Sequence, residues 1–235
     1  MGFRKLGFIA AIALATNSSW AEDHSTTSGG SAPPDIEKVC SQTACRTGGY
    51  EAVVGVDPQR YTTIPVTRSP YILDDGSVLI FPGETIAVQL AVDGGKLGRP
   101  MAAERYAPEF PALIVKSDGA PEANPENASL AALQGKMPAD EVANLPPNTL
   151  VVSYGQFKEK GESGMTLTLL HNFSQTIKLD AIIAEIRPNA YEQHYTSTCP
   201  VRPKMSDFEN WPNALGPLVL KNFRFQADGQ SVVCE

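Results

Sequence analysis

The chain has 235 residues and a formal net charge of −7 at pH 7, with 42% hydrophobic and 8% aromatic residues. The apolar content is too high for general disorder, and the negative charge argues against nucleic acid or anionic lipid as a bulk partner. A chain of this length has room for a single elaborated domain with a substantial core.

The first 21 residues have the layout of a secretory signal peptide. Arg4 and Lys5 form a positively charged start, residues 6–15 are a short apolar run, and Ser19-Trp20-Ala21 supplies small residues at the cleavage positions. The apolar run is too short to span a bilayer. We therefore predict an exported protein, periplasmic or secreted, that is cleaved after Ala21 and has no membrane span.

Four cysteines lie beyond the predicted cleavage point, and an even number in an exported chain indicates two disulfides. The four are Cys40, Cys45, Cys199 and Cys234. We favour Cys40 with Cys45 and Cys199 with Cys234, although loop-closure entropy leaves a cross-pairing open. The C-x4-C spacing argues against a redox-active pair.

The first half of the expected domain, which spans residues 39–235, is a series of short strands. Residues 22–38 are rich in Ser, Thr, Gly and Pro and predict a flexible tether. Strands are expected at residues 50–56, 61–66, 71–73, 77–81 and 84–92. Asp74-Asp75-Gly76 is a hairpin turn signal, and Asp93-Gly94-Gly95 ends the last of these strands.

Residues 96–148 contain eight prolines and are interpreted as an insertion. Only residues 112–116 have a strand pattern, and short helices are expected at 127–134 and from Pro138. Long loops in compact domains are often functional, but a packed connector is the favoured interpretation.

The clearest period-two alternation lies within residues 164–187, which we interpret as a long β-hairpin. Met165, Leu167 and Leu169 alternate with threonines, and the alternation resumes from Ile177 after the turn-prone residues 171–175. Another strand is expected at 150–157. After Pro188 the chain is expected to be irregular until strands at 218–225 and 231–234.

About ten short strands separated by turn signals predict a mainly β fold, an antiparallel β-sandwich with a Pro-rich insertion that carries one or two short helices. The strand pattern resembles that of immunoglobulin-like sandwiches in the broad sense, over most of the chain beyond the leader. The resemblance implies architecture alone, because folds of this type host many functions.

No familiar catalytic motif is present, and we assign no catalytic residue, metal or cofactor. His24 lies in the expected tether, and His171 is interpreted as a solvated turn residue. His194 lies beside Glu192 and could be a base or a ligand, but a structural role is favoured for a histidine without a placed partner.

A blue-copper site is a further possibility, because Pro82-Gly83-Glu84-Thr85 and the expected sandwich loosely resemble cupredoxins. Such a site needs two histidines, a cysteine and usually a methionine. His171, Cys199 and Met205 occur in the required order, but no histidine lies between the last two. The missing ligand argues against copper.

Paired carboxylates of a glycosidase are recognised by a separation that sequence does not supply. The scattered candidates are Asp74, Asp75, Glu84, Asp180, Glu185 and Glu209. Asp74 and Asp75 are more simply explained by turn chemistry.

An aromatic-rich segment near the C-terminus is the candidate binding surface. Its predicted binding residues are Tyr191, His194, Tyr195, Phe208 and Trp211. Packing at the open end of the sandwich is the alternative for these side chains.

The favoured function is a non-enzymatic binding or interaction module of the cell envelope, with a protein or a polysaccharide as its partner. One alternative is an envelope-directed hydrolase of carbohydrate or ester bonds that uses His194 or a carboxylate pair. A second alternative is a structural subunit that assembles through exposed strand edges.

Overall fold

The computed structural model describes residues 35–57, 60–106, 114–115, 144–159, 162–188 and 190–227. In these residues the fold is mainly β, all strand pairings are antiparallel, and helix α1 (Ile36–Cys40) has only five residues. The strands are β1 (Cys45–Arg46), β2 (Tyr50–Asp57), β3 (Arg60–Val66), β4 (Ser69–Pro70), β5 (Val78–Ile80), β6 (Thr85–Asp93), β7 (Lys96–Arg105), β8 (Ile114–Val115), β9 (Thr149–Glu159), β10 (Glu162–His171), β11 (Ile177–Ile186), β12 (Tyr191–Ser197), β13 (Ser206–Trp211) and β14 (Leu215–Phe225). The described part of the chain contains no helix that is long and apolar enough to cross a membrane.

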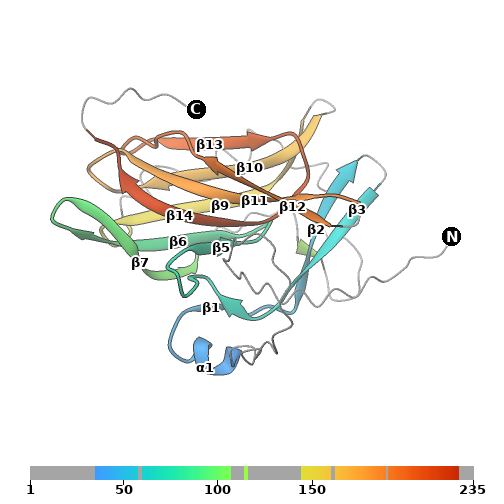
Figure 1. Ribbon diagram of the computed structural model, residues 1–235, viewed down its shortest axis with the longest axis horizontal. Coiled ribbons are helices and arrows are strands. Elements are labelled where there is room, and N and C mark those ends of the chain that lie inside the picture. The colour runs from blue at the N-terminus through green and yellow to red at the C-terminus, as the bar shows by residue number, and fades with distance from the viewer. Residues whose placement is uncertain are drawn as a thin grey trace, which may run out of the picture. The chain divides into compact units, whose positions relative to one another are not determined.

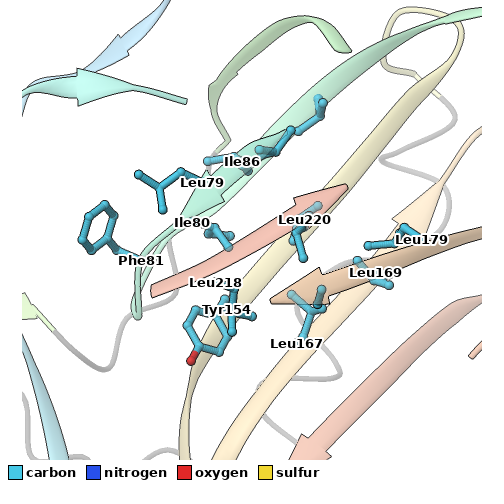
Figure 2. Close-up of a cluster of buried hydrophobic side chains, with 14 of the residues drawn as sticks. Leu79, Ile80, Phe81, Ile86, Tyr154, Leu167, Leu169, Leu179, Leu218 and Leu220 are labelled. Carbon is cyan, nitrogen blue, oxygen red and sulfur yellow. The ribbon is translucent and has the colours of Figure 1, made fainter. Parts of the chain in front are cut away.

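Figure 1 shows two larger antiparallel sheets. Both contribute side chains to one hydrophobic core. One sheet has the strand order β13-β10-β9-β6-β7 and the other has the order β12-β11-β14-β5. Alternation along each strand puts apolar side chains on one face, and each sheet buries that face against the other. Figure 2 shows the resulting cluster, which includes Ile86, Tyr154, Leu167 and Leu169 of the first sheet and Ile80, Leu179, Leu218 and Leu220 of the second.

The segment expected to form a long hairpin instead connects the two sheets. Strand β10 pairs with β9 and β13, whereas β11 pairs with β12 and β14. Between them Phe173 is buried in the core. The hairpin prediction was wrong because alternation shows which face a strand buries, not whether its neighbour lies beside it or across the core. The hairpin partner of β10 is β9, where Glu159 lies opposite Glu162.

Besides the two-residue strands β1 and β4, three longer strands occupy segments where the sequence did not predict a strand. Strand β7 lies at the start of the expected insertion, and β12 and β13 lie in the segment expected to be irregular. Each is an edge strand of its sheet. Edge strands tolerate polar and charged residues and proline, so their sequences lack a clear apolar alternation.

The turn predicted at Asp74-Asp75-Gly76 is confirmed. Gly76 has a φ of 80°, its N–H donates to the Leu73 carbonyl at 2.8 Å, and Leu73 N–H donates to Ser77 O at 2.8 Å. A positive φ at this position is easily adopted only by glycine. Residue 76 therefore closes the turn into β5.

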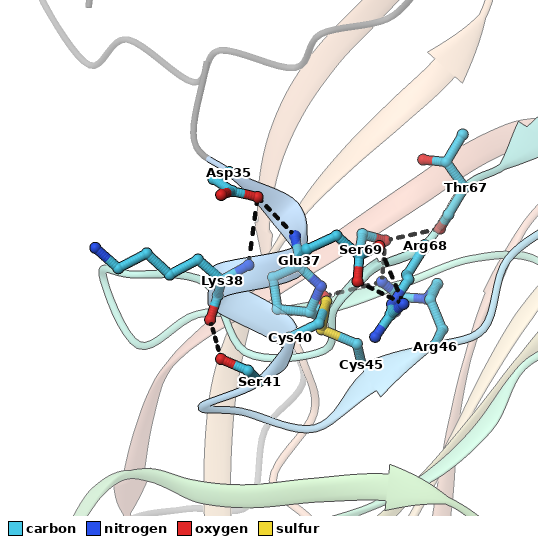
Figure 3. The surroundings of a disulfide bond; sticks show 11 residues. Asp35, Glu37, Lys38, Cys40, Ser41, Cys45, Arg46, Thr67, Arg68 and Ser69 are labelled. Atoms are coloured by element: carbon cyan, nitrogen blue, oxygen red, sulfur yellow. Dashed lines mark hydrogen bonds and ion pairs between the residues drawn. A yellow bond between two sulfur atoms is a disulfide. The ribbon is translucent and has the colours of Figure 1, made fainter. Parts of the chain in front are cut away.

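The last three residues of the predicted tether, 36–38, belong to helix α1. The Asp35 carboxylate accepts hydrogen bonds from the backbone N–H groups of Glu37 and Lys38, which caps α1. The favoured disulfide joins Cys40 at the end of this helix to Cys45, with the Cα atoms 5.5 Å apart (Figure 3). Cys199 is also disulfide-bonded. The remaining cysteine, Cys234, lies outside the described residues.

Arg46 anchors this N-terminal segment to the domain. Its side chain is 2% exposed and contacts both carboxylate oxygens of Glu84, at 2.8 and 3.2 Å. It also donates to the carbonyl of Leu79 at 2.7 Å and lies over the rings of Tyr71 and Phe81. A buried charge is tolerated only when it is paired in this way.

A third sheet, of order β3-β2-β8, adds residues such as Val54 and Ile64 to the same core. Gln156 of β9 connects it to the five-stranded sheet, because its side-chain amide exchanges two hydrogen bonds with the backbone of Gly55, at 2.7 and 2.8 Å. Strand β8 lies within the predicted strand at 112–116. The predicted helices at 127–134 and from Pro138, and the predicted strand at 231–234, lie outside the described residues.

Candidate functional site

Edge strand β12 carries three of the five predicted binding residues and divides them between its two faces. Tyr195 lies opposite Ile182 of β11, and His194 lies opposite the core residue Ile183. Opposed residues of an antiparallel pair share a face, and successive residues alternate between faces. Tyr191 and Tyr195 therefore share the outer face of the sheet, and His194 lies on the face that carries the core.

Tyr195 is 61% exposed, but hydrogen bonds fix its position. Its hydroxyl donates to the carboxylate of Asp180 on β11, which also accepts hydrogen bonds from Asn222 at 2.8 Å and Arg224 at 2.9 Å. Burial alone would raise the pKa of Asp180, but these three hydrogen bonds and the charge of Arg224 lower the pKa to about 2. Asp180 is therefore an ionised acceptor at neutral pH, and charge-assisted hydrogen bonds are stronger than neutral ones.

Two cationic side chains, Lys221 and Arg224, lie close to Tyr195 and its acceptor Asp180. Lys221 Nζ lies 5.6 Å from the centre of the Tyr195 ring, and Arg224 lies opposite Lys178 in the β11–β14 ladder. Tyr191 is 49% exposed and its ring lies against the backbone of Gly216. A Cβ atom at position 216 would come within 2.8 Å of that ring, so the close approach requires glycine.

On its other face, β12 brings His194 to two carboxylates. His194 Nε2 lies 3.3 Å from Glu185 of β11 and 3.7 Å from Glu192, and it makes no hydrogen bond although it is shielded from solvent. Arg187 contacts both glutamates, at 3.0 and 2.8 Å. The three donor atoms lie within 4.8 Å of one another, a group that could hold a metal ion.

The other two predicted residues, Phe208 and Trp211, lie on β13 in the five-stranded sheet, in place of the expected irregular loop. Phe208 lies opposite Thr168 and is 42% exposed. Trp211 lies opposite Met165 and packs against the core. The two aromatic side chains therefore point to opposite faces, and neither belongs to the face that carries Tyr191 and Tyr195.

His171 is buried in the structure, where the sequence predicted a solvated turn residue. Its Nε2 lies 2.9 Å from the Val201 carbonyl, and its Nδ1 accepts a hydrogen bond from the N–H of Phe173 at 3.2 Å. Burial lowers the pKa of His171, against the opposing effect of the hydrogen bond to Val201. A neutral ring with both nitrogens occupied is a structural residue. Cys199, the proposed thiolate of a copper site, is disulfide-bonded.

Most carboxylates considered for a paired-acid site have a structural partner: Asp75 bonds Ser77 in the turn, Glu84 pairs with Arg46, and Asp180 holds Tyr195. Glu209 accepts a hydrogen bond from the backbone N–H of Cys199, and burial raises its pKa. Asp207, two residues earlier on the same strand, also has a pKa raised by burial. Among the described residues, two groups of neighbouring carboxylates remain, Glu185 with Glu192 and Asp207 with Glu209.

Sequence reasoning placed His194 beside Glu192 and named Glu185 as a candidate acid, but it did not bring Glu185 next to His194. A strand assignment for residues 191–197 would have put Glu192 and His194 on one face and the tyrosines on the other, but the approach of Glu185 depends on the pairing of β11 with β12. No local signal could have joined Asp180 to Asn222 and Arg224, which lie 42 and 44 residues further along the chain.

No protein-family model, curated protein or solved structure matches this chain.

Proposed function

We propose that this protein is an exported, non-enzymatic binding module of the cell envelope, built as an immunoglobulin-like sandwich with a Pro-rich insertion. The signal-peptide pattern supports export, and the Cys40–Cys45 disulfide is typical of proteins in oxidising compartments. The two antiparallel sheets that share one core support the sandwich architecture. The contact surface is the outer face of β12 around Tyr191 and Tyr195.

The binding proposal depends on one observation above all: the exposed ring of Tyr195 is held in place by a hydrogen bond to Asp180. A tyrosine that is already held by Asp180 loses little side-chain freedom when a partner covers it. Tyrosine and arginine are enriched among the residues that dominate binding energy at interfaces. Lys221 and Arg224 lie close to the ring, so the partner that best fits this face is a protein with an acidic surface.

Site-specific cross-linking in the native host tests this surface. A photoreactive phenylalanine analogue at position 195 should cross-link to an envelope protein. The same analogue at Tyr61, which is 51% exposed on β3, should not. Tyr195→Ala should weaken binding of the captured partner by about tenfold or more.

Two results would contradict the proposal. Equal cross-linking from positions 195 and 61 would show that the face is not specific. A cross-linked product that contains carbohydrate instead of protein would show that the partner is a polysaccharide.

A hydrolase remains a second candidate because His194 lies 3.3 Å from Glu185, within reach of an acid partner. It predicts turnover of an envelope carbohydrate or ester by the purified chain. That turnover should be lost in His194→Gln and retained in Tyr195→Ala. Equal turnover in His194→Gln and the unmodified chain would remove this candidate.

A further inference from the structure

We propose that Glu185, Glu192 and His194 form a Zn²⁺ site and that Arg187 occupies it as a resident cation until the metal displaces it. The site is independent of the proposed contact surface, because His194 and Tyr195 lie on opposite faces of β12.

The strand pairing explains why these three side chains converge. Glu192 and His194 are two residues apart on β12, so they share a face, and Glu192 lies directly opposite Glu185 in the ladder. The backbone therefore positions all three ligands on two adjacent, hydrogen-bonded strands. Ligands on regular strands need little reordering to bind a metal.

The two distances from His194 are close to those of tetrahedral coordination. Zinc bonds to nitrogen and oxygen of about 2.0–2.2 Å separate neighbouring ligand atoms by about 3.3–3.6 Å in a tetrahedron. His194 Nε2 lies 3.3 Å from the nearest Glu185 oxygen and 3.7 Å from the nearest Glu192 oxygen. This nitrogen is shielded from solvent and makes no hydrogen bond, so its lone pair is available when the ring proton lies on Nδ1.

The donor set selects among metals. An imidazole nitrogen with two carboxylates suits Zn²⁺, whereas Ca²⁺ and Mg²⁺ are bound by oxygen ligands alone. Three protein ligands leave the fourth tetrahedral position open to water or to another molecule.

Arg187 has the position expected of a competing cation. Its guanidinium contacts Glu185 at 3.0 Å and Glu192 at 2.8 Å, so it balances one of the two negative charges that a metal would neutralise. The Arg187 side chain is 48% exposed and can turn into solvent, whereas the carboxylate of Glu185 is only 9% exposed. Entry of Zn²⁺ then leaves the two carboxylates and the metal with no net charge.

Calorimetric titration of the full chain with ZnCl₂ tests the site. We expect one Zn²⁺ per chain, and a loss of affinity of about tenfold or more in His194→Gln and in Glu192→Gln. Arg187→Gln should tighten binding by about tenfold, because it removes the competing charge. CaCl₂ should produce no saturable heat and should not displace the zinc.

Glu104→Gln is the matched control, because it removes one exposed carboxylate from β7 and should leave Zn²⁺ affinity unchanged. Unfolding of each variant without metal checks that it is folded. His194 and Glu192 are chosen because their side chains, 40% and 52% exposed, are less buried than that of Glu185. No zinc binding by the unmodified chain and Arg187→Gln, or equal binding by His194→Gln, would overturn the site. Weaker binding by Arg187→Gln would overturn the displacement of that side chain.

Discussion

Several polar side chains that the sequence offered as catalytic or ligand candidates instead make hydrogen bonds within the fold. His171 is closed in by Val201 and Phe173, and Asp180 accepts hydrogen bonds from three side chains. The two histidines whose side chains are described differ in the hydrogen bonding of their ring nitrogens. His171 has both nitrogens occupied, whereas Nε2 of His194 has no hydrogen-bond partner.

The buried His171 predicts a pH dependence of stability. Because burial lowers its pKa below the ordinary value of about 6.5, the unfolded chain takes up the proton first as pH falls. The stabilising contribution is fully present above about pH 6.5 and is lost as pH falls through the lower pKa of the folded protein. His171→Gln should remove this part of the pH dependence, measured by denaturant unfolding between about pH 7 and 5.

The other titratable groups are the same in both proteins, so the difference between the two pH profiles isolates the histidine. His171→Gln should be less stable at pH 7, because glutamine reproduces the ring's two hydrogen bonds imperfectly. Parallel profiles for the variant and the unmodified chain would contradict the burial of a neutral imidazole.

Among the structural elements, the strands that the sequence did not predict and the N-terminal segment are held in place by contacts with residues far along the chain. Strands β12 and β13 have few apolar residues of their own, and each forms because β11 or β10 presents an unpaired edge to it. Strand β1 has only two residues. Its Arg46 side chain donates a hydrogen bond to the Leu79 carbonyl of β5 and forms an ion pair with Glu84, which directly precedes β6. Short elements of this kind are ordered by tertiary bonds, since their own propensity is too weak.

Loss of the Arg46 guanidinium should be severely destabilising. Arg46→Met leaves the Glu84 carboxylate buried without its cation, which costs about 3–5 kcal/mol in comparable pairs. The double variant Arg46→Met/Glu84→Gln should recover part of this loss, because the uncompensated charge is removed. The free energies of unfolding of the single and the double variant are measured in guanidinium chloride.

Arg68→Met is the matched control. Arg68 pairs with Glu37 at 2.9 Å, but both side chains are exposed, and such pairs contribute about 0–1 kcal/mol. If Arg46→Met were no less stable than Arg68→Met, Arg46 would not be the anchor of the N-terminal segment.

For the whole molecule, export and oxidation are the properties that the sequence predicts most directly. Cys40 and Cys45 are joined, and Cys199 is bonded to a partner outside the described residues. Intact mass spectrometry of protein from its native host should find a chain that begins at Glu22 and is four protons lighter than its reduced form. A chain that retains residues 1–21, or one with free thiols, would contradict export to an oxidising compartment.

The sequence alone predicted the β class, the Asp74-Asp75-Gly76 turn and the Cys40–Cys45 pairing, because each depends on residues that are close along the chain. Only the tertiary structure decided that β10 and β11 lie in different sheets, because alternation encodes the buried face and not the neighbour. The same holds for the network around Asp180, whose partners come from β12 and β14, and for the approach of Glu185 to His194. Such sites are set by strand pairing, which joins residues far apart in sequence, whereas the local pattern of each strand shows only which way its side chains point.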